Sequence, residues 1–269
     1  METIIENSGL ELHIEGQGEE TLVMIHGWPD THRLWDGQVA ALKSRYRCAR
    51  FSLPGFERGQ QSQLLDMEQM MQALDTAINL ASAHKPVILM LHDWGCFYGY
   101  QYAMRHPERV SRIIAVDIGD SGSRDHKLST GAKLLAASYQ LYLALCWKLG
   151  RFVGNPMTRL IAKAMGAPAQ RGDIHSGMNF PYYWLWKGLL TKQKLGIKPV
   201  AIDQPMLFVY GSKKPFNFHS QALVDKLNGT EGSAAHGLET GHWVMVEQPE
   251  TFNQLVLDWL QGDRAEKVA

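Results

Sequence analysis

The chain has 269 residues, enough for one large domain or two small ones, and its 45% hydrophobic content excludes wholesale disorder. Lysine and arginine number 27, as do aspartate and glutamate, so a net charge of zero predicts no attraction to nucleic acid or to an anionic membrane. The three cysteines, Cys48, Cys96 and Cys146, form no CxxC motif, which argues against a zinc or disulfide framework and suits a reducing compartment.

Short apolar strands alternate with amphipathic helices in the first third of the chain and again in the last. The predicted strands cover 2–6, 10–15, 21–26, 46–51, 86–91, 110–116, 205–210 and 232–238. The predicted helices cover 33–43, 67–83, 95–105, 220–227 and 249–261. This order predicts an α/β fold with a mostly parallel, doubly wound sheet, built from residues 1–119 and 199–269. Residues 120–198, rich in Tyr, Trp and Leu, are predicted to form an inserted helical lid.

Neither the start of the chain nor its longest apolar stretch resembles a membrane or export segment. The first residues, METIIENSG, are acidic where a signal peptide needs basic residues. Residues 134–147 are too short and too polar to span a bilayer. We therefore expect a soluble, cytoplasmic protein that binds a small-molecule substrate, with no nucleic-acid or membrane partner, and a homodimer stays open.

The segment LMLHDWGC at 89–96 carries the first chemical signal. An apolar strand runs directly into a helix, with Asp93 at the junction and Gly95 two residues later, as in a nucleophile elbow. The usual pattern places a glycine on each side of the nucleophile, and Leu91 replaces the first one. The start of the helix favours an ionised carboxylate. The alternative is that Asp93 only caps the helix.

Two further motifs end strands at the same edge of the predicted sheet, where ligands bind in open α/β folds. In HGWPD, at 26–30, the glycine lets the backbone approach a substrate, and the Trp28 amide can form half of an oxyanion hole. The Trp94 amide would form the other half. In the GHW segment, His242 lies where a base can reach this edge.

These motifs, with FSLPGFERG at 51–59, RHPERV at 105–110 and GHWVMVEQPE at 241–250, resemble the α/β-hydrolase superfamily, specifically its aspartate-nucleophile branch of epoxide hydrolases and haloalkane dehalogenases. The resemblance implies a two-step reaction. Asp93 attacks an electrophilic carbon and forms an alkyl-enzyme ester, and His242 activates the water that hydrolyses the ester. The resemblance also implies that His26, Trp28 and Trp94 belong to the oxyanion and substrate site.

The acid that orients His242 is less obvious. Much of this family places it after the strand corresponding to 205–210, in a G-x-x-D turn, whereas this chain has GSKKP at 211–215. Other members of the superfamily place it after the strand that ends near residue 116, which nominates Asp117, with Asp120 as the alternative. A capped turn is the other reading of Asp117.

Two aromatic segments of the predicted lid bear on the electrophile. The family of epoxide hydrolases uses two lid tyrosines to donate a proton to the opening epoxide. SYQLY at 138–142 resembles one such segment and nominates Tyr139. NFPYYW at 179–184 resembles the other and nominates Tyr182 ahead of Tyr183, a further candidate for substrate binding. For most of these aromatic residues, packing within the lid is the alternative.

We therefore expect a hydrolase that opens a small uncharged electrophile, with an epoxide giving a diol as the first choice. A haloalkane-type dehalogenase is the alternative enzyme, and a catalytically idle binding protein of the same fold is the alternative class. The chain contains no HExxH motif, P-loop or dinucleotide fingerprint, so no metal or organic cofactor is expected. The segment from Lys213 to His219 matches no expectation for this chemistry.

Overall fold

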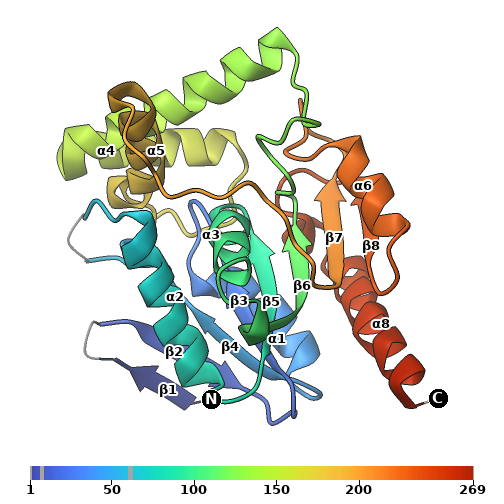
Figure 1. The fold of residues 1–269 in the computed structure, drawn as a ribbon. Helices are drawn as coiled ribbons and strands as arrows, with labels where there is room; N and C mark the ends of the chain where they lie inside the picture. Colours follow the sequence, from blue (N-terminus) through green and yellow to red (C-terminus); the bar gives the residue numbers. More distant parts are fainter. Residues whose placement is uncertain (1, 7–8, 60–62, 269) are drawn as a thin grey trace.

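The computed structural model describes residues 2–6, 9–59 and 63–268 and contains an eight-stranded sheet with the order β1-β2-β4-β3-β5-β6-β7-β8 (Figure 1). Neighbouring strands from β4 to β8 are parallel, and β1 and β2 pair antiparallel at one edge. The strands are β1 (Glu2–Ile5), β2 (Glu11–Glu15), β3 (Thr21–Ile25), β4 (Arg47–Phe51), β5 (Val87–His92), β6 (Val110–Val116), β7 (Met206–Gly211) and β8 (Ala234–Leu238).

Helices cover both faces of the sheet. The helices packed on the sheet are α1 (Asp36–Leu42), α2 (Met67–Ala81), α3 (Trp94–Ala103), α6 (Gln221–Asn228) and α8 (Pro249–Val268), with the short α7 (Val244–Glu247) before α8. The central strand β5 shows why two layers are needed, since all six of its residues are buried. Its alternate side chains enter two separate hydrophobic clusters, which explains the unbroken apolar run in the sequence.

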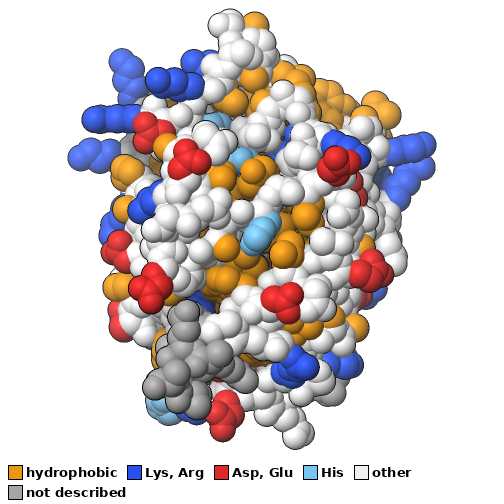
Figure 2. Space-filling view, turned by 90° about the vertical axis from the view of Figure 1, so that its right-hand side faces the viewer, with side chains coloured by type: hydrophobic (Ala, Val, Ile, Leu, Met, Phe, Trp, Pro, Cys, Tyr) orange, Lys and Arg blue, Asp and Glu red, His pale blue; other side chains and the backbone are white. Residues whose placement is uncertain are grey.

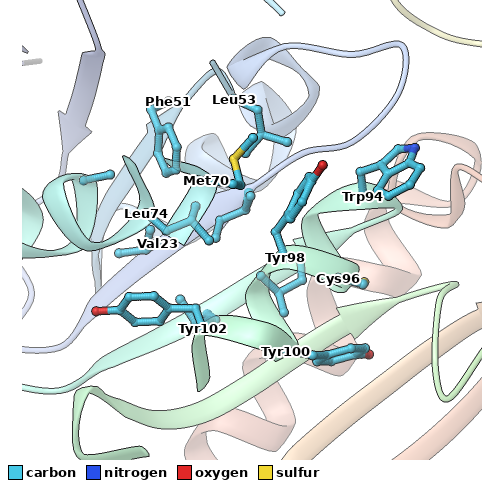
Figure 3. Packing of buried hydrophobic residues seen from close by; sticks show 14 of the residues in the cluster. Val23, Phe51, Leu53, Met70, Leu74, Trp94, Cys96, Tyr98, Tyr100 and Tyr102 are labelled. Atoms are coloured by element: carbon cyan, nitrogen blue, oxygen red, sulfur yellow. The ribbon is translucent and has the colours of Figure 1, made fainter. Parts of the chain in front are cut away.

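Each cluster fills one side of the sheet. One contains the inner faces of α2 and α3, and Figure 3 shows Met70 and Leu74 of α2 in the same cluster as Tyr98 of α3. The other contains side chains of α1 and α8, such as Val39 and Phe252. The fold class predicted from the sequence is therefore confirmed.

The segment between β6 and β7 is helical, and we call residues 120–198 the insertion. It contains α4 (Thr130–Ala164), the 3-10 turn η3 (Ser176–Asn179) and α5 (Phe180–Thr191). At Gly150, φ is +68° and α4 is kinked. Figure 1 shows α4 and α5 above the carboxyl ends of the central strands, where they cover the edge at which the three motifs end.

The predicted elements are present with small shifts of their ends. The largest differences concern two helices: the one predicted over 33–43 is divided into a 3-10 turn, η1 (His32–Trp35), and α1, and the last one continues to Val268. Among the described helices, none is long and apolar enough to cross a membrane.

Candidate active site

Asp93 occupies the tight turn between β5 and α3. Its φ of 51° and ψ of −120° lie in a region that side-chain-bearing residues rarely adopt, so the surrounding structure must hold the strained turn. A Cβ atom on Gly95 would collide with the Ile25 carbonyl oxygen, which explains the glycine two residues after the turn. The Asp93 side chain makes no capping hydrogen bond to α3, so helix capping does not explain this residue.

Leu91 stands where the usual elbow pattern has its first glycine, and the structure shows how it is accommodated. The Leu91 side chain is fully buried and extends toward α3. A Cβ atom on Gly99 would collide with the Leu91 methyl groups. Gly99, one turn into α3, therefore supplies the space that the missing glycine would have left, and the turn keeps its geometry.

His242 lies between two carboxylates that come from distant parts of the chain. Its Nε2 atom is 3.5 Å from Oδ2 of Asp93, and its Nδ1 atom is 2.5 Å from Oδ2 of Asp117. Burial lowers the pKa of His242, but the two carboxylates outweigh burial and raise it to about 9. The structure thus places Asp117, at the end of β6, within the hydrogen-bond distance expected of an orienting acid.

Lys214, which lies in the segment that matched no expectation from the sequence, forms a polar contact with Asp117. Its ammonium group forms an ion pair with Oδ1 of Asp117, and the Gly211 amide donates to the same oxygen over 3.1 Å. The Lys214 side chain is only 8% exposed and the Asp117 side chain is fully buried. Burial alone would raise the pKa of Asp117, yet His242 and Lys214 lower it to about 2. The lysine in the turn after β7 therefore faces the acid after β6.

Asp120, the alternative acid, has a different position. Its Oδ1 atom accepts a hydrogen bond from the Ser220 amide over 2.7 Å, and its Oδ2 atom accepts bonds from the Ser220 and Ser123 hydroxyls. Asp120 thus joins the start of the insertion to the first turn of α6. The structure gives it no contact with His242.

A buried ion pair loses stability when one partner is removed, because the other charge stays in the interior without compensation. We therefore expect Lys214→Met to lower the free energy of unfolding by about 3–5 kcal/mol in urea titrations at pH 7. Its neighbour provides the control, since Lys213 is 64% exposed and pairs with the exposed Glu239. Lys213→Met should cost less than about 1 kcal/mol. Equal losses in the two variants would contradict the structural importance of Lys214.

The backbone amide of Trp28 approaches Asp93 directly. It donates to Oδ1 of Asp93 over 2.7 Å. A Cβ atom on Gly27 would collide with the same carboxylate, so the loop can approach only with a glycine there. The Trp94 amide is the first of α3 and has no acceptor within the helix. Both amides predicted for an oxyanion hole therefore lie beside the Asp93 carboxyl group.

His26 has two contacts with the backbone that hold the loop after β3. It is fully buried, its Nε2 atom accepts from the Leu53 amide over 2.9 Å, and its Nδ1 atom lies 2.9 Å from the Gly27 carbonyl oxygen. Since an amide donates to Nε2, the proton resides on Nδ1. Burial lowers the pKa of His26 to about 4, so the ring is neutral.

The two nominated tyrosines meet over the site. Tyr139 comes from α4 and Tyr182 from α5, and their ring centroids are 6.2 Å apart. The Tyr182 ring also lies 6.1 Å from the ring of Trp28 and 5.2 Å from that of Trp94. Burial, with a further contribution from the Asp93 charge, raises the pKa of Tyr139 to about 12 and raises that of Tyr182 well above the usual value of a phenol. Both phenols are therefore protonated at neutral pH and lie close enough to Asp93 to respond to its charge.

Tyr183 is not part of this group. Its ring stacks on Trp147 of α4, with centroids 4.3 Å apart. The neighbouring residue on α5 thus packs against α4 within the insertion.

Several polar residues that hold the motifs in place were not singled out from the sequence. The Trp28 indole donates to Oδ1 of Asn179 over 2.7 Å, which ties the loop after β3 to the insertion. The Trp243 indole donates to the buried Asp30 over 2.8 Å and so joins the HGWPD and GHW segments. The last residue of β5, His92, lies with Nε2 3.1 Å from the His242 carbonyl oxygen. The one hint of these contacts in the sequence is that the motifs contain several polar residues besides the candidate catalytic ones.

Within the described part of the chain, no group of three or more His, Cys, Asp or Glu side chains is arranged to hold a metal ion.

The comparisons with known proteins identify the family and the fold. The family described as alpha/beta hydrolase fold matches residues 20–248. The AB hydrolase superfamily protein YfhM of Bacillus subtilis (strain 168) is 24% identical over 96% of this chain and 97% of its own length. Epoxide hydrolase 3 of Xenopus tropicalis is 23% identical over 96% of this chain and 77% of its own length.

Solved structures show the same architecture at lower identity. An epoxide hydrolase of Bacillus megaterium, in complex with an inhibitor, superposes with a TM-score of 0.71 at 17% identity over 97% of this chain and all of that one. A loop variant of the haloalkane dehalogenase DbeA from Bradyrhizobium elkanii gives 0.70 at 16% identity over 100% of this chain and 98% of that one. At such identities these likenesses establish the fold. With the family matched over most of its length, the chain belongs to the α/β-hydrolase family.

Proposed function

We propose that the protein hydrolyses epoxides to diols through an ester on Asp93. One observation carries this proposal: the Asp93 carboxylate lies 3.5 Å from His242, and the phenols of Tyr139 and Tyr182, both protonated, are near enough for the Asp93 charge to raise their pKa values. A nucleophile, a base and a pair of acids are the groups that epoxide opening and ester hydrolysis require. Relatives with the name epoxide hydrolase support the same choice.

In the first step, an Asp93 oxygen attacks a ring carbon of the epoxide. The carbon–oxygen bond breaks, and its electron pair leaves with the oxygen, which takes a proton from Tyr139 or Tyr182. The donors gain strength as negative charge develops on the epoxide oxygen, so they stabilise the transition state more than the bound substrate. Their raised pKa values keep them protonated until the alkoxide, a much stronger base, is formed.

In the second step, His242 takes a proton from water while the water oxygen attacks the carbonyl carbon of the ester. The Trp28 and Trp94 amides stabilise the oxyanion. The diol oxygen leaves with the proton that His242 had taken, and the second proton of the water returns from the Asp93 carboxyl group to the tyrosine phenolate, which restores the Asp93 carboxylate and the phenol. The charge of Asp93 contributes to the pKa of about 9 of His242 in the resting enzyme. Because the ester is uncharged, that pKa falls when the ester forms, and His242 becomes a base at the stage that needs one.

A set of tyrosine variants tests the epoxide assignment. Tyr139→Phe and Tyr182→Phe should each reduce epoxide turnover by about 10–1,000-fold, the effect of losing one hydrogen-bond donor or general acid. Diol formation from a panel of aryl and alkyl epoxides is the measurement. Tyr183→Phe is the matched control on α5, because the Tyr183 ring stacks on Trp147. Turnover by this variant should stay within about twofold of the wild type.

A parallel panel of haloalkanes, assayed for released halide, distinguishes the alternative enzyme. Halide release without diol formation would reject the epoxide assignment, as would full epoxide turnover in both tyrosine variants. The Trp28 indole N–H, one group that could hold a departing halide, already donates to Asn179, which disfavours the dehalogenase.

A further inference from the structure

The net charge of zero conceals an uneven distribution of charge. The insertion, residues 120–198, contains twelve lysines and arginines but only three aspartates and no glutamate. Because the whole chain carries 27 basic and 27 acidic residues, the rest of the protein holds the opposite excess. Helix α4 is the extreme case, with five basic residues and no acidic one over its 35 residues.

Eleven of the twelve basic side chains are exposed. Figure 2 shows Lys and Arg side chains projecting on both sides of the upper part of the molecule, the part that contains the insertion in Figure 1. Among the described residues, none of the twelve forms an ion pair. The exposed members are Arg124, Lys127, Lys133, Lys148, Arg151, Lys163, Arg171, Lys187, Lys192, Lys194 and Lys198.

The exposed apolar side chains gather in the same place. Of fourteen large hydrophobic residues classed as exposed in the described chain, only Ile5 and Val246 lie outside the insertion. The twelve inside it are Leu134, Leu135, Leu141, Leu145, Leu149, Phe152, Val153, Leu160, Met165, Leu189, Leu190 and Ile197. Such a concentration on one side of a monomer marks an interaction surface.

The spacing on α4 shows that this surface is organised. Leu134, Leu141 and Leu145 recur at intervals of seven and four residues, so they share one face of the helix, and they are 45–68% exposed. The opposite face packs on the protein, where Leu143 and Cys146 are fully buried. Helix α4 therefore presents exposed leucines on the face that points away from the protein.

We propose that the insertion docks on the surface of an anionic lipid bilayer. Its leucines would enter the boundary between headgroups and acyl chains, and its lysines and arginines would lie against lipid phosphates. A nucleic acid would match the charge but leave the leucines in water. A second copy of the chain, paired face to face through this surface, would bring two strongly positive insertions together. The proposal departs from the expectation based on net charge alone, because the attraction depends on the local excess of the insertion.

Docking in this way has a consequence for the catalytic side of the protein. Helix α4 carries Tyr139, whose ring meets Tyr182 over the Asp93 site, so that site would lie about one helix diameter, or roughly 10 Å, below the lipid. Apolar compounds concentrate in bilayers, and the protein would meet them there. Lipid binding itself requires no turnover, so its test is independent of the proposed hydrolysis.

Sedimentation with vesicles tests the proposal. The protein should bind vesicles made of equal parts of phosphatidylglycerol and phosphatidylcholine. Its affinity for vesicles of phosphatidylcholine alone should be at least about tenfold lower. High salt should release it, since the attraction between exposed charges is screened. Absence of binding to the mixed vesicles, or equal binding to both kinds, would overturn the proposal.

Charge-reversal pairs locate the binding surface. Lys148→Glu with Arg151→Glu should reduce binding to mixed vesicles by about tenfold or more. Lys85→Glu with Lys226→Glu, exposed positions outside the insertion, changes the net charge by the same amount and should leave binding unchanged. Equal losses in the two pairs would show a response to overall charge and overturn the proposal. Circular dichroism confirms that each variant is folded.

Double substitutions of exposed hydrophobic residues test the apolar contribution to vesicle binding. Leu134→Gln with Phe152→Gln removes side chains that are 68% and 79% exposed and should weaken vesicle binding severalfold. Ile5→Gln with Val246→Gln makes the same change outside the insertion and should have no effect. Sedimentation velocity without lipid tests the other candidate for this surface, a second copy of the chain. A wild-type dimer that the first pair converts to monomer would show that the surface binds another copy of the chain, and would overturn the proposal.

Discussion

Asp93→Ala is expected to reduce epoxide turnover by about four orders of magnitude or more, the loss typical of removing the central group of a catalytic unit. The reason is that no other described carboxylate is placed to replace it: Asp117 is fully buried and its two oxygens already bind His242 and Lys214. Steady-state diol formation measures the loss. Because the side chain makes no capping bond, the fold should remain intact by circular dichroism.

Asp120→Asn is the control for that variant. Its carboxylate lies between Ser123 and Ser220 and does not contact His242, so the variant should turn over epoxide at close to the wild-type rate. Substantial activity in Asp93→Ala would reject a covalent mechanism through this residue, whatever the control shows.

His242→Gln should separate the two steps, because formation of the ester needs the nucleophile and the phenols, whereas its hydrolysis needs the base. After incubation with an accepted epoxide, intact-protein mass spectrometry should show one added substrate mass, and peptide mapping should locate it on Asp93. Wild-type protein should show little or no adduct, since hydrolysis removes it.

The double variant with Asp93→Ala and His242→Gln is the matched control and should gain no mass. In single-turnover experiments on the wild type, ester hydrolysis should slow as the pH falls through the pKa of His242 in the ester, which lies below its resting value of about 9. An unmodified His242→Gln protein, tested with a substrate that the wild type consumes, would contradict the ester mechanism.

The parts of the site that the sequence predicted are those with local signatures. The apolar run before Asp93, the glycine at 95 and the break before a helix together describe one turn, and the structure has that turn. Asp117 and His242 also follow strands of the sheet, so the parallel order of the strands brings them to one edge. The fold class depended on the same alternation of strands and helices, which is readable in short windows.

The parts that could not be predicted depend on residues far apart in the chain. Nothing near residue 91 indicates that Gly99 makes room for its side chain. His26 stands in a catalytic motif, yet its ring binds the backbone of Leu53, which the motif does not contain. The surface of the insertion was hidden for a different reason, since its basic excess cancels against the acidic remainder when the chain is counted as a whole.

The buried pair of Asp117 and Lys214 also limits the substitutions that could move the orienting acid from one strand to the other. Lys214→Asp alone would place an acid in the turn after β7, where much of the family has it. The carboxylates at 117 and 214 would then both lie near the His242 imidazole, without the lysine between them. Changing Asp117 alone to a neutral residue would leave an ammonium group buried close to His242. Each single exchange therefore passes through an uncompensated interior charge, and relocating the acid requires both positions to change together.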